Sequence, residues 1–81
     1  MVYRTKGTCS QAINVEAENG IVTKVQFVGG CAGNTAGIAK LVVGMKVDDV
    51  INRLEGTTCG PRPTSCPDQL AKALKQLKAE L

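Results

Sequence analysis

Apolar and polar residues alternate along the first third of the chain with a period of two, which is typical of β-strands. The alternation runs over residues 11–18 and again over 21–28, and Asn19-Gly20 separates the two segments. An Asn-Gly pair supplies the two positive φ angles that a type I′ turn needs. The sequence therefore predicts a β-hairpin, and a shorter alternation over Tyr3 to Lys6 adds a third strand.

After Gly29-Gly30 the apolar spacing changes to the period of helices. A first helix is predicted after a Gly33-Asn34 cap, ending around Gly44. Its apolar side is predicted to consist of Ile38, Leu41, Val42 and Met45. A second, short helix has Val47, Val50, Ile51 and Leu54 at helical spacing and is ended by Gly56.

The third predicted helix begins at Pro67, after a loop that spans Gly56 to Pro67. Ser65 or Cys66 is its cap, and Asp68 lies in the first turn. Its apolar stripe is predicted to be Leu70, Leu74, Leu77 and Leu81. Strands first and helices after indicate an α+β domain, in which a three-stranded antiparallel sheet is followed by three helices packed on one face (β-β-β-α-α-α). Residues 1–81 are expected to be a single domain.

The composition narrows the chemistry that this domain can perform. The chain has 81 residues, four cysteines, one tyrosine, one phenylalanine and no histidine. The missing histidine excludes Cys–His and Ser–His catalysis and every zinc site that contains histidine. Because domains this small often need a cross-link or a metal to supplement a thin core, the cysteines are the first candidates for that role.

The charge pattern argues against several partners. The net charge is +3, and Lys72, Lys75 and Lys78 recur on what we expect to be the solvated face of the last helix, although docking of an acidic protein stays open. The lack of stacking aromatics argues against nucleic acid. The glycine-rich corner at residues 29–35 fits neither a P-loop nor a dinucleotide fingerprint, which argues against nucleotide binding. No membrane span or signal core is visible, so we expect a cytoplasmic protein.

All four cysteines lie in predicted junctions: Cys9 after the first strand, Cys31 at the strand-to-helix corner, and Cys59 and Cys66 before the last helix. These junctions can converge at one edge of such a sheet, which favours a tetrathiolate metal site with Zn²⁺. Two alternatives stay open. The cysteines can be small buried hydrophobes, or they can be redox thiols, since Cys31 and Cys66 are predicted at helix starts.

The string Thr64-Ser65-Cys66-Pro67-Asp68 resembles the signature of the TSCPD family of small four-cysteine proteins. Gly7-Thr8-Cys9-Ser10, Gly29-Gly30-Cys31 and Cys59-Gly60 resemble its other cysteine blocks. Related modules occur at the C-terminus of some ribonucleotide reductases, which implies a ribonucleotide reductase as partner. The chain has no room for a nucleotide barrel, so the resemblance does not imply that it is itself a reductase.

The order of elements is also similar to the iron–sulfur cluster scaffold fold. Cys9, Cys31 and Cys66 match the three cluster-binding cysteines of that fold, but Gln11 and Ser65 stand where scaffold proteins have an acidic residue and a histidine. With Cys59 as a fourth thiolate, the site is expected to be closed. We therefore expect a non-enzymatic zinc-binding module, acting as an accessory or regulatory partner of ribonucleotide reductase. The alternatives are an iron–sulfur scaffold or carrier and a thiol redox component of a ribonucleoside-diphosphate reductase.

Overall fold

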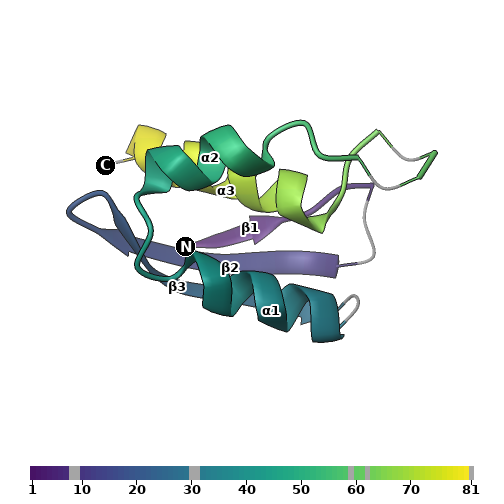
Figure 1. Cartoon of the computed structure of the whole chain (residues 1–81), viewed down its shortest axis with the longest axis horizontal. Helices are drawn as coiled ribbons and strands as arrows, with labels where there is room; N and C mark the ends of the chain where they lie inside the picture. Colours follow the sequence, from purple (N-terminus) through teal and green to yellow (C-terminus); the bar gives the residue numbers. More distant parts are fainter. Residues whose placement is uncertain (8–9, 30–31, 59, 62, 81) are drawn as a thin grey trace.

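The computed structural model of the chain describes residues 1–7, 10–29, 32–58, 60–61 and 63–80. Three strands come first, β1 (Val2–Arg4), β2 (Ser10–Glu18) and β3 (Ile21–Gly29), and three helices follow, α1 (Ala32–Val42), α2 (Val47–Leu54) and α3 (Cys66–Glu80). The strands form one antiparallel sheet in the order β1-β2-β3. The predicted α+β arrangement, in the order β-β-β-α-α-α, is confirmed (Figure 1).

The predicted hairpin is formed by β2 and β3. Both turn residues have positive φ, 54° at Asn19 and 78° at Gly20, as a type I′ turn requires. The first strand lies slightly earlier than predicted, because the N–H of Val15 donates to the carbonyl of Met1 at 2.9 Å and holds this end of the chain in the sheet. After Arg4 the chain leaves the sheet.

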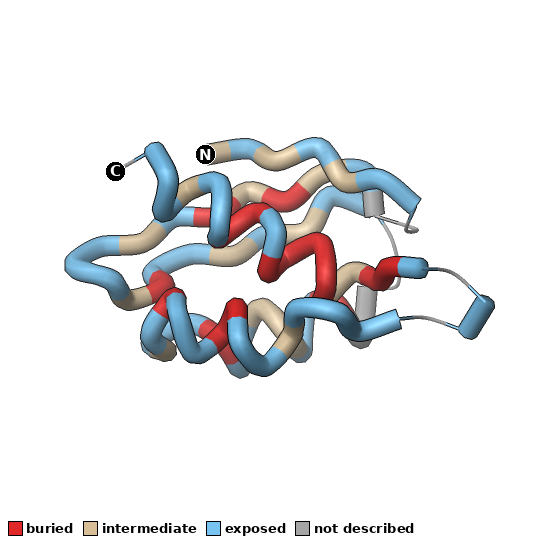
Figure 2. Tube along the Cα trace, turned by 90° about the horizontal axis from the view of Figure 1, so that it is seen from above, coloured by how far each residue is buried: buried red, intermediate tan, exposed pale blue. Residues whose placement is uncertain are grey.

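The core lies between one face of the sheet and the helices. α3 contacts β2 and α2, and α1 contacts β3. The largest fully buried side chains come from both layers: Ile13, Val15, Val22, Val50, Leu70 and Leu74. In Figure 2 the buried segments form a continuous band through α3 and the strand beneath it. On the other face of the sheet, side chains such as Glu16 and Gln26 are exposed.

Helix α1 buries a narrower stripe than the sequence predicted. Val42 is buried, and Ile38 and Met45 pack against the core, but Leu41 is 76% exposed, so its predicted place on the apolar side is wrong. Successive helical residues are rotated by about 100°. Because α1 contacts only β3 in the sheet, a residue rotated that far from Val42 has no layer to pack against.

The lysines of α3 are exposed, as predicted, but each is paired within the chain. Lys72 pairs with Asp68 of the same helix at 3.2 Å, Lys75 with Glu55, and Lys78 with Asp48. The last two pairs join α3 to the segment that contains α2, so this face ties two helices together. Within the described ranges, no helix has the combination of length and apolar character that crossing a membrane demands.

Candidate functional site

Cys66 is the one predicted site residue that the structure describes, as the half-buried first residue of α3. Cys9, Cys31 and Cys59 lie outside the described residues, and so does Leu81 of the predicted apolar stripe. In the described part of the chain, which holds one of the four cysteines, no three Cys, Asp or Glu side chains are grouped so that they could hold a metal ion. The residues that flank the other cysteines do locate their segments.

The segments of Cys9 and Cys31 are neighbours across the sheet. Ser10, which directly follows Cys9, is the Cα partner of Gly29, which comes two residues before Cys31. Helix α1 begins at Ala32, directly after Cys31. In Figure 1 the start of β2, the end of β3 and the starts of α1 and α3 all lie at the end of the molecule opposite the β2–β3 turn. We call this the cysteine end.

The residues before Cys9 lie against the start of α3. The N–H of Lys6 donates to Oε1 of Gln69 at 3.1 Å. Gly7 has a φ of 76° and approaches Thr64 so closely that a Cβ on Gly7 would lie 2.9 Å from the Thr64 Cγ2 methyl. Glycine is therefore required here both by the backbone conformation and by the space.

The residues before Cys59 are also held by the start of α3. The N–H of Gly56 donates to Oδ1 of Asp68 at 2.7 Å, and the hydroxyl of Ser65 donates to the carbonyl of Thr57 at 2.7 Å. Two chain segments that are far apart in sequence, each leading to a cysteine, are thus bonded to the same first turn of α3.

These bonds depend on four buried polar residues, which we call the polar cluster: Thr64, Ser65, Asp68 and Gln69. Ser65 is the cap of α3, since its hydroxyl oxygen accepts the N–H of Asp68 at 3.2 Å and its carbonyl accepts the N–H of Gln69 at 2.8 Å. This confirms the predicted cap and makes Cys66 the first helical residue. The amide of Gln69 donates to the hydroxyl oxygen of Thr64 at 3.0 Å, and the hydroxyl of Thr64 donates to Oδ2 of Asp68.

Asp68 is the charged centre of the polar cluster and is only 3% exposed. Burial raises the pKa of its carboxyl, but hydrogen bonds from the Thr64 hydroxyl and the Gly56 N–H, together with the ammonium of Lys72, more than offset this. The pKa of Asp68 therefore lies below its ordinary 3.8, and the carboxylate is ionised at neutral pH. With these donors bound, the carboxylate acts as an anchor for the neighbouring segments.

The sequence indicated only part of this cluster. The spacing of Ser65 and Asp68 is that of a capping box and predicted the helix start. The roles of Thr64 and Gln69 were missed, although polar residues at the start of an apolar helix stripe are a usable signal. No local pattern points to the bond between Asp68 and Gly56, because its partners are twelve residues apart and meet only in the fold.

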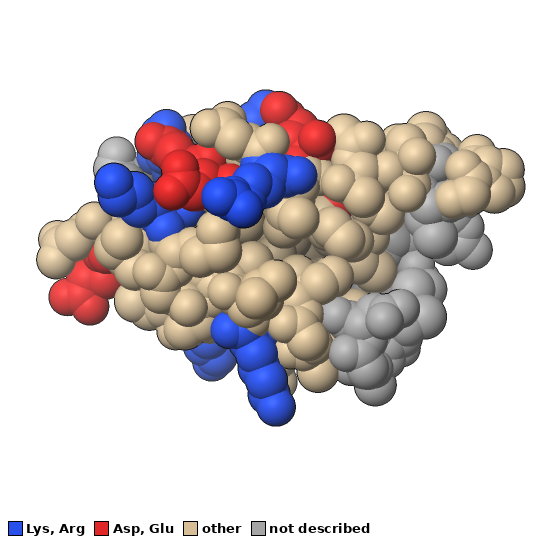
Figure 3. All heavy atoms as spheres, viewed as in Figure 1, with Lys and Arg blue, Asp and Glu red and all other residues tan. Residues whose placement is uncertain are grey.

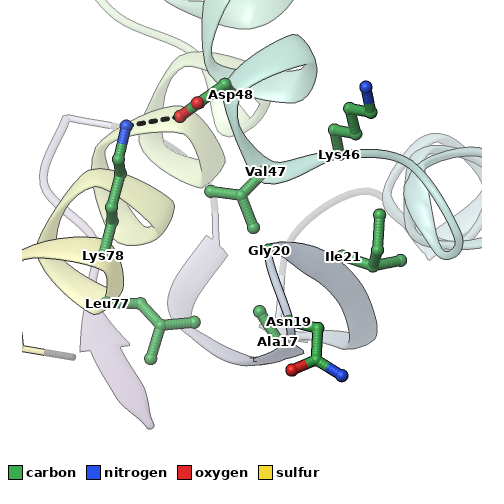
Figure 4. A pocket seen from close by; sticks show the side chains of 9 residues that line it. All are labelled: Ala17, Asn19, Gly20, Ile21, Lys46, Val47, Asp48, Leu77 and Lys78. Carbon is green, nitrogen blue, oxygen red and sulfur yellow. Dashed lines mark hydrogen bonds and ion pairs between the residues drawn. The ribbon is translucent and has the colours of Figure 1, made fainter.

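A separate cavity of about 270 Å³ lies away from the cysteine end, between the β2–β3 turn, the start of α2 and the end of α3. Figure 4 shows Leu77, Val47 and Ala17 around this space, with the ion pair between Lys78 and Asp48 at its rim. Its lining combines apolar side chains with backbone of the turn, and it contains no cysteine. This cavity is therefore independent of the candidate metal site.

A family model of the TSCPD domain matches residues 1–78. No curated protein and no solved structure matches the chain. The family match covers all four cysteines and the whole polar cluster, and it includes the residues of the cysteine end that the structure describes.

Proposed function

Because the chain belongs to the TSCPD domain family, we propose that it is a non-enzymatic module that binds one Zn²⁺ through the thiolates of Cys9, Cys31, Cys59 and Cys66. One observation carries the proposal. The described residues that flank all four cysteines meet at the cysteine end, held there by cross-strand pairing and by the polar cluster. Four thiolates are a complete tetrahedral ligand set for Zn²⁺.

The available donors support a site made of sulfur alone. The chain has no histidine. Asp68, the acidic residue nearest to Cys66 in sequence, already accepts hydrogen bonds from Thr64 and Gly56 and pairs with Lys72. A metal would have to break these bonds to recruit the carboxylate. Cys66 itself is at the positive end of the α3 dipole, which favours a negatively charged ligand.

A metal at the cysteine end would add stability that this core does not supply by itself. The fully buried side chains are all aliphatic and few, and structural Zn²⁺ contributes on the order of 10 kcal/mol in small domains. An iron–sulfur cluster is the alternative occupant, since the same thiolates can bind it. Thiol redox exchange is the alternative without a metal.

The test is elemental analysis together with the visible spectrum of protein purified without oxygen. We expect about one zinc per chain and no visible absorption, because Zn²⁺ has no d–d transitions. Visible absorption with bound iron would instead indicate a cluster, and metal-free protein with a reversible disulfide would indicate redox thiols.

Single Cys→Ser variants at the four positions test the ligand set. Each is expected to lose zinc and to melt at a lower temperature, whereas the control Thr58→Ala, an exposed neighbour of Cys59, retains both. Full zinc occupancy with an unchanged melting temperature in Cys59→Ser would contradict the four-thiolate site. That result would leave a three-cysteine site of the scaffold kind.

The proposal extends to location and partner. We place the module in the reducing cytoplasm, where thiolates stay available to a metal, and we propose a ribonucleotide reductase as the protein that it assists, on the strength of the resemblance of its cysteine blocks. The test mixes the zinc-loaded chain with purified reductase and measures complex formation by analytical ultracentrifugation and nucleotide reduction by product formation. No complex at micromolar concentrations, and no effect on reduction, would remove this part of the proposal.

A further inference from the structure

The outer edge of β3 has backbone groups without a partner. In β2, both backbone groups of Val15 face β1, since its N–H donates to the Met1 carbonyl at 2.9 Å and its carbonyl accepts from the Met1 amine at 3.0 Å. Val25 is the Cα partner of Val15. In an antiparallel pair it must then direct its own N–H and carbonyl away from β2. The same alternation turns Phe27, the partner of Ile13, outward.

The lower half of this edge is already used. The N–H of Val22 donates to the Met45 carbonyl at 2.9 Å, and its carbonyl accepts the Gly44 N–H at 2.8 Å. Val22 and Val25 both face outward, although they are three residues apart, because the pairing register shifts between them. Across the described ranges, no backbone group bonds the outward N–H and carbonyl groups of Val25 and Phe27.

A groove lies beside these unpaired groups. It has a volume of about 470 Å³ and lies between the edge of β3 and α1. On the α1 side it is lined by Ala36 and Ala39, whose small side chains leave it open, and on the strand side by Val25 and Phe27. A strand added at the usual spacing of about 4.8 Å would place alternate side chains in this groove.

The charges near the groove favour an acidic occupant. Lys40 lines it and Lys24 precedes Val25 on the edge strand; both are exposed, and neither forms an ion pair with any described residue. The three α3 lysines are all paired. Figure 3 shows this contrast, with acidic and basic spheres interleaved over α2 and α3 but basic spheres without an acidic neighbour on the lower side.

We propose that an extended segment of a partner protein, with acidic side chains, binds in this groove as a fourth strand on the edge of β3. The inference goes beyond the proposed metal site and does not depend on it. A second copy of the chain is the wrong occupant, because pairing two β3 edges would bring four lysines together with no acidic lining residue. Lysine on an edge strand is a known device against such self-pairing.

The test uses a fluorescein-labelled peptide of about eight residues with alternating Glu and Val, a length typical of a strand. We expect saturable binding by fluorescence anisotropy, and amide chemical shift changes centred on Val25, Phe27 and α1. Methylating alternate peptide nitrogens removes the hydrogen bonds without changing the protein and should abolish binding. The Lys40→Glu variant should bind about tenfold more weakly, whereas Arg53→Glu, the same charge change at an exposed site on α2, should bind as the wild type does.

Several outcomes would overturn the proposal. Absence of saturable binding up to about 1 mM peptide would show that α1 blocks the edge. Equal binding of the methylated peptide, or of a peptide with Lys in place of Glu, would show that neither the edge groups nor the charges are used. A concentration-dependent dimer with shift changes on β3 would identify a second copy as the occupant.

Discussion

Replacing Asp68 by Asn tests whether the polar cluster holds the cysteine end together. The variant retains the shape of the side chain and removes its charge. The remaining amide oxygen can still accept the Gly56 N–H, but the amide nitrogen is a donor that must face the donors Thr64 and Lys72. The hydrogen bond between Thr64 and Asp68 is therefore lost in a site that is 3% exposed at Asp68.

The size of the effect follows from these contacts. Loss of a buried hydrogen bond to a charged acceptor costs about 1.5–3 kcal/mol, and weakening of the Gly56 bond adds roughly 0.5–1. The Lys72 ammonium contributes below about 0.5 because half of its side chain is exposed to solvent. Relief of desolvation of the carboxylate offsets about 1 kcal/mol. We expect a loss of about 2–3 kcal/mol, which lowers the melting temperature of a domain of this size by roughly 10–20 °C.

Urea unfolding and thermal melts of the protein at fixed metal content measure this loss. The control is Asp49→Asn, the same charge change at an exposed residue of α2, which should cost at most about 0.5–1 kcal/mol. Hydrogen exchange gives a second readout, because the amides of Gly56 and Lys6 should exchange faster in Asp68→Asn alone. Equal losses in the two variants, or unchanged exchange at both amides, would refute the anchoring role of Asp68.

Three further predictions follow from the same contacts. Ser65→Ala removes both the cap of α3 and the bond to the Thr57 carbonyl, so urea unfolding should show a loss of about 2 kcal/mol. Gly7→Ala should cost more than Gly20→Ala, which has nearly the same φ but nothing within 4 Å of the added Cβ; equal melting temperatures would show that the contact with Thr64 is unimportant. Because the pKa of Asp68 is lowered in the folded state, its ionisation stabilises the fold above the ordinary carboxyl pKa. That contribution is lost as the pH falls through the folded pKa, and acid titration of Asp68→Asn should lack this part of the decline.

The sequence predicted the elements whose signals are local. The Asn19-Gly20 turn, the alternation that buries Ile13 and Val15, and the cap at Ser65 each depend on a few neighbouring residues, and all are observed. The exposure of Leu41 was not predictable in the same way. Periodicity gives the apolar side of a helix, but the width of the buried stripe depends on how many elements pack against it.

The candidate site shows the same limit. The positions of the cysteines in junctions were readable from the chain, but the bonds that bring those junctions together join residues that are distant in sequence. Lys6 and Gln69 are 63 positions apart. The lysines of α3 were similarly read as a solvated face, since their acidic partners Glu55 and Asp48 belong to another part of the chain and are placed only by the packing of α2 on α3.

The Thr64–Asp68 motif thus contains two kinds of residue with separable roles. Thr64, Ser65 and Asp68 fix the segments before Cys9 and Cys59 to the start of α3, and they do so with hydrogen bonds that need no metal. Cys66 takes no part in those printed contacts and begins the helix that they hold. A thiolate site assembled from four loops must bring together segments whose free motion opposes binding, and each segment already fixed lowers that entropic cost. The buried polar residues of the motif are therefore best understood as preorganising the ligands, which explains why a metal module would retain an ionised carboxylate in its core beside its cysteines.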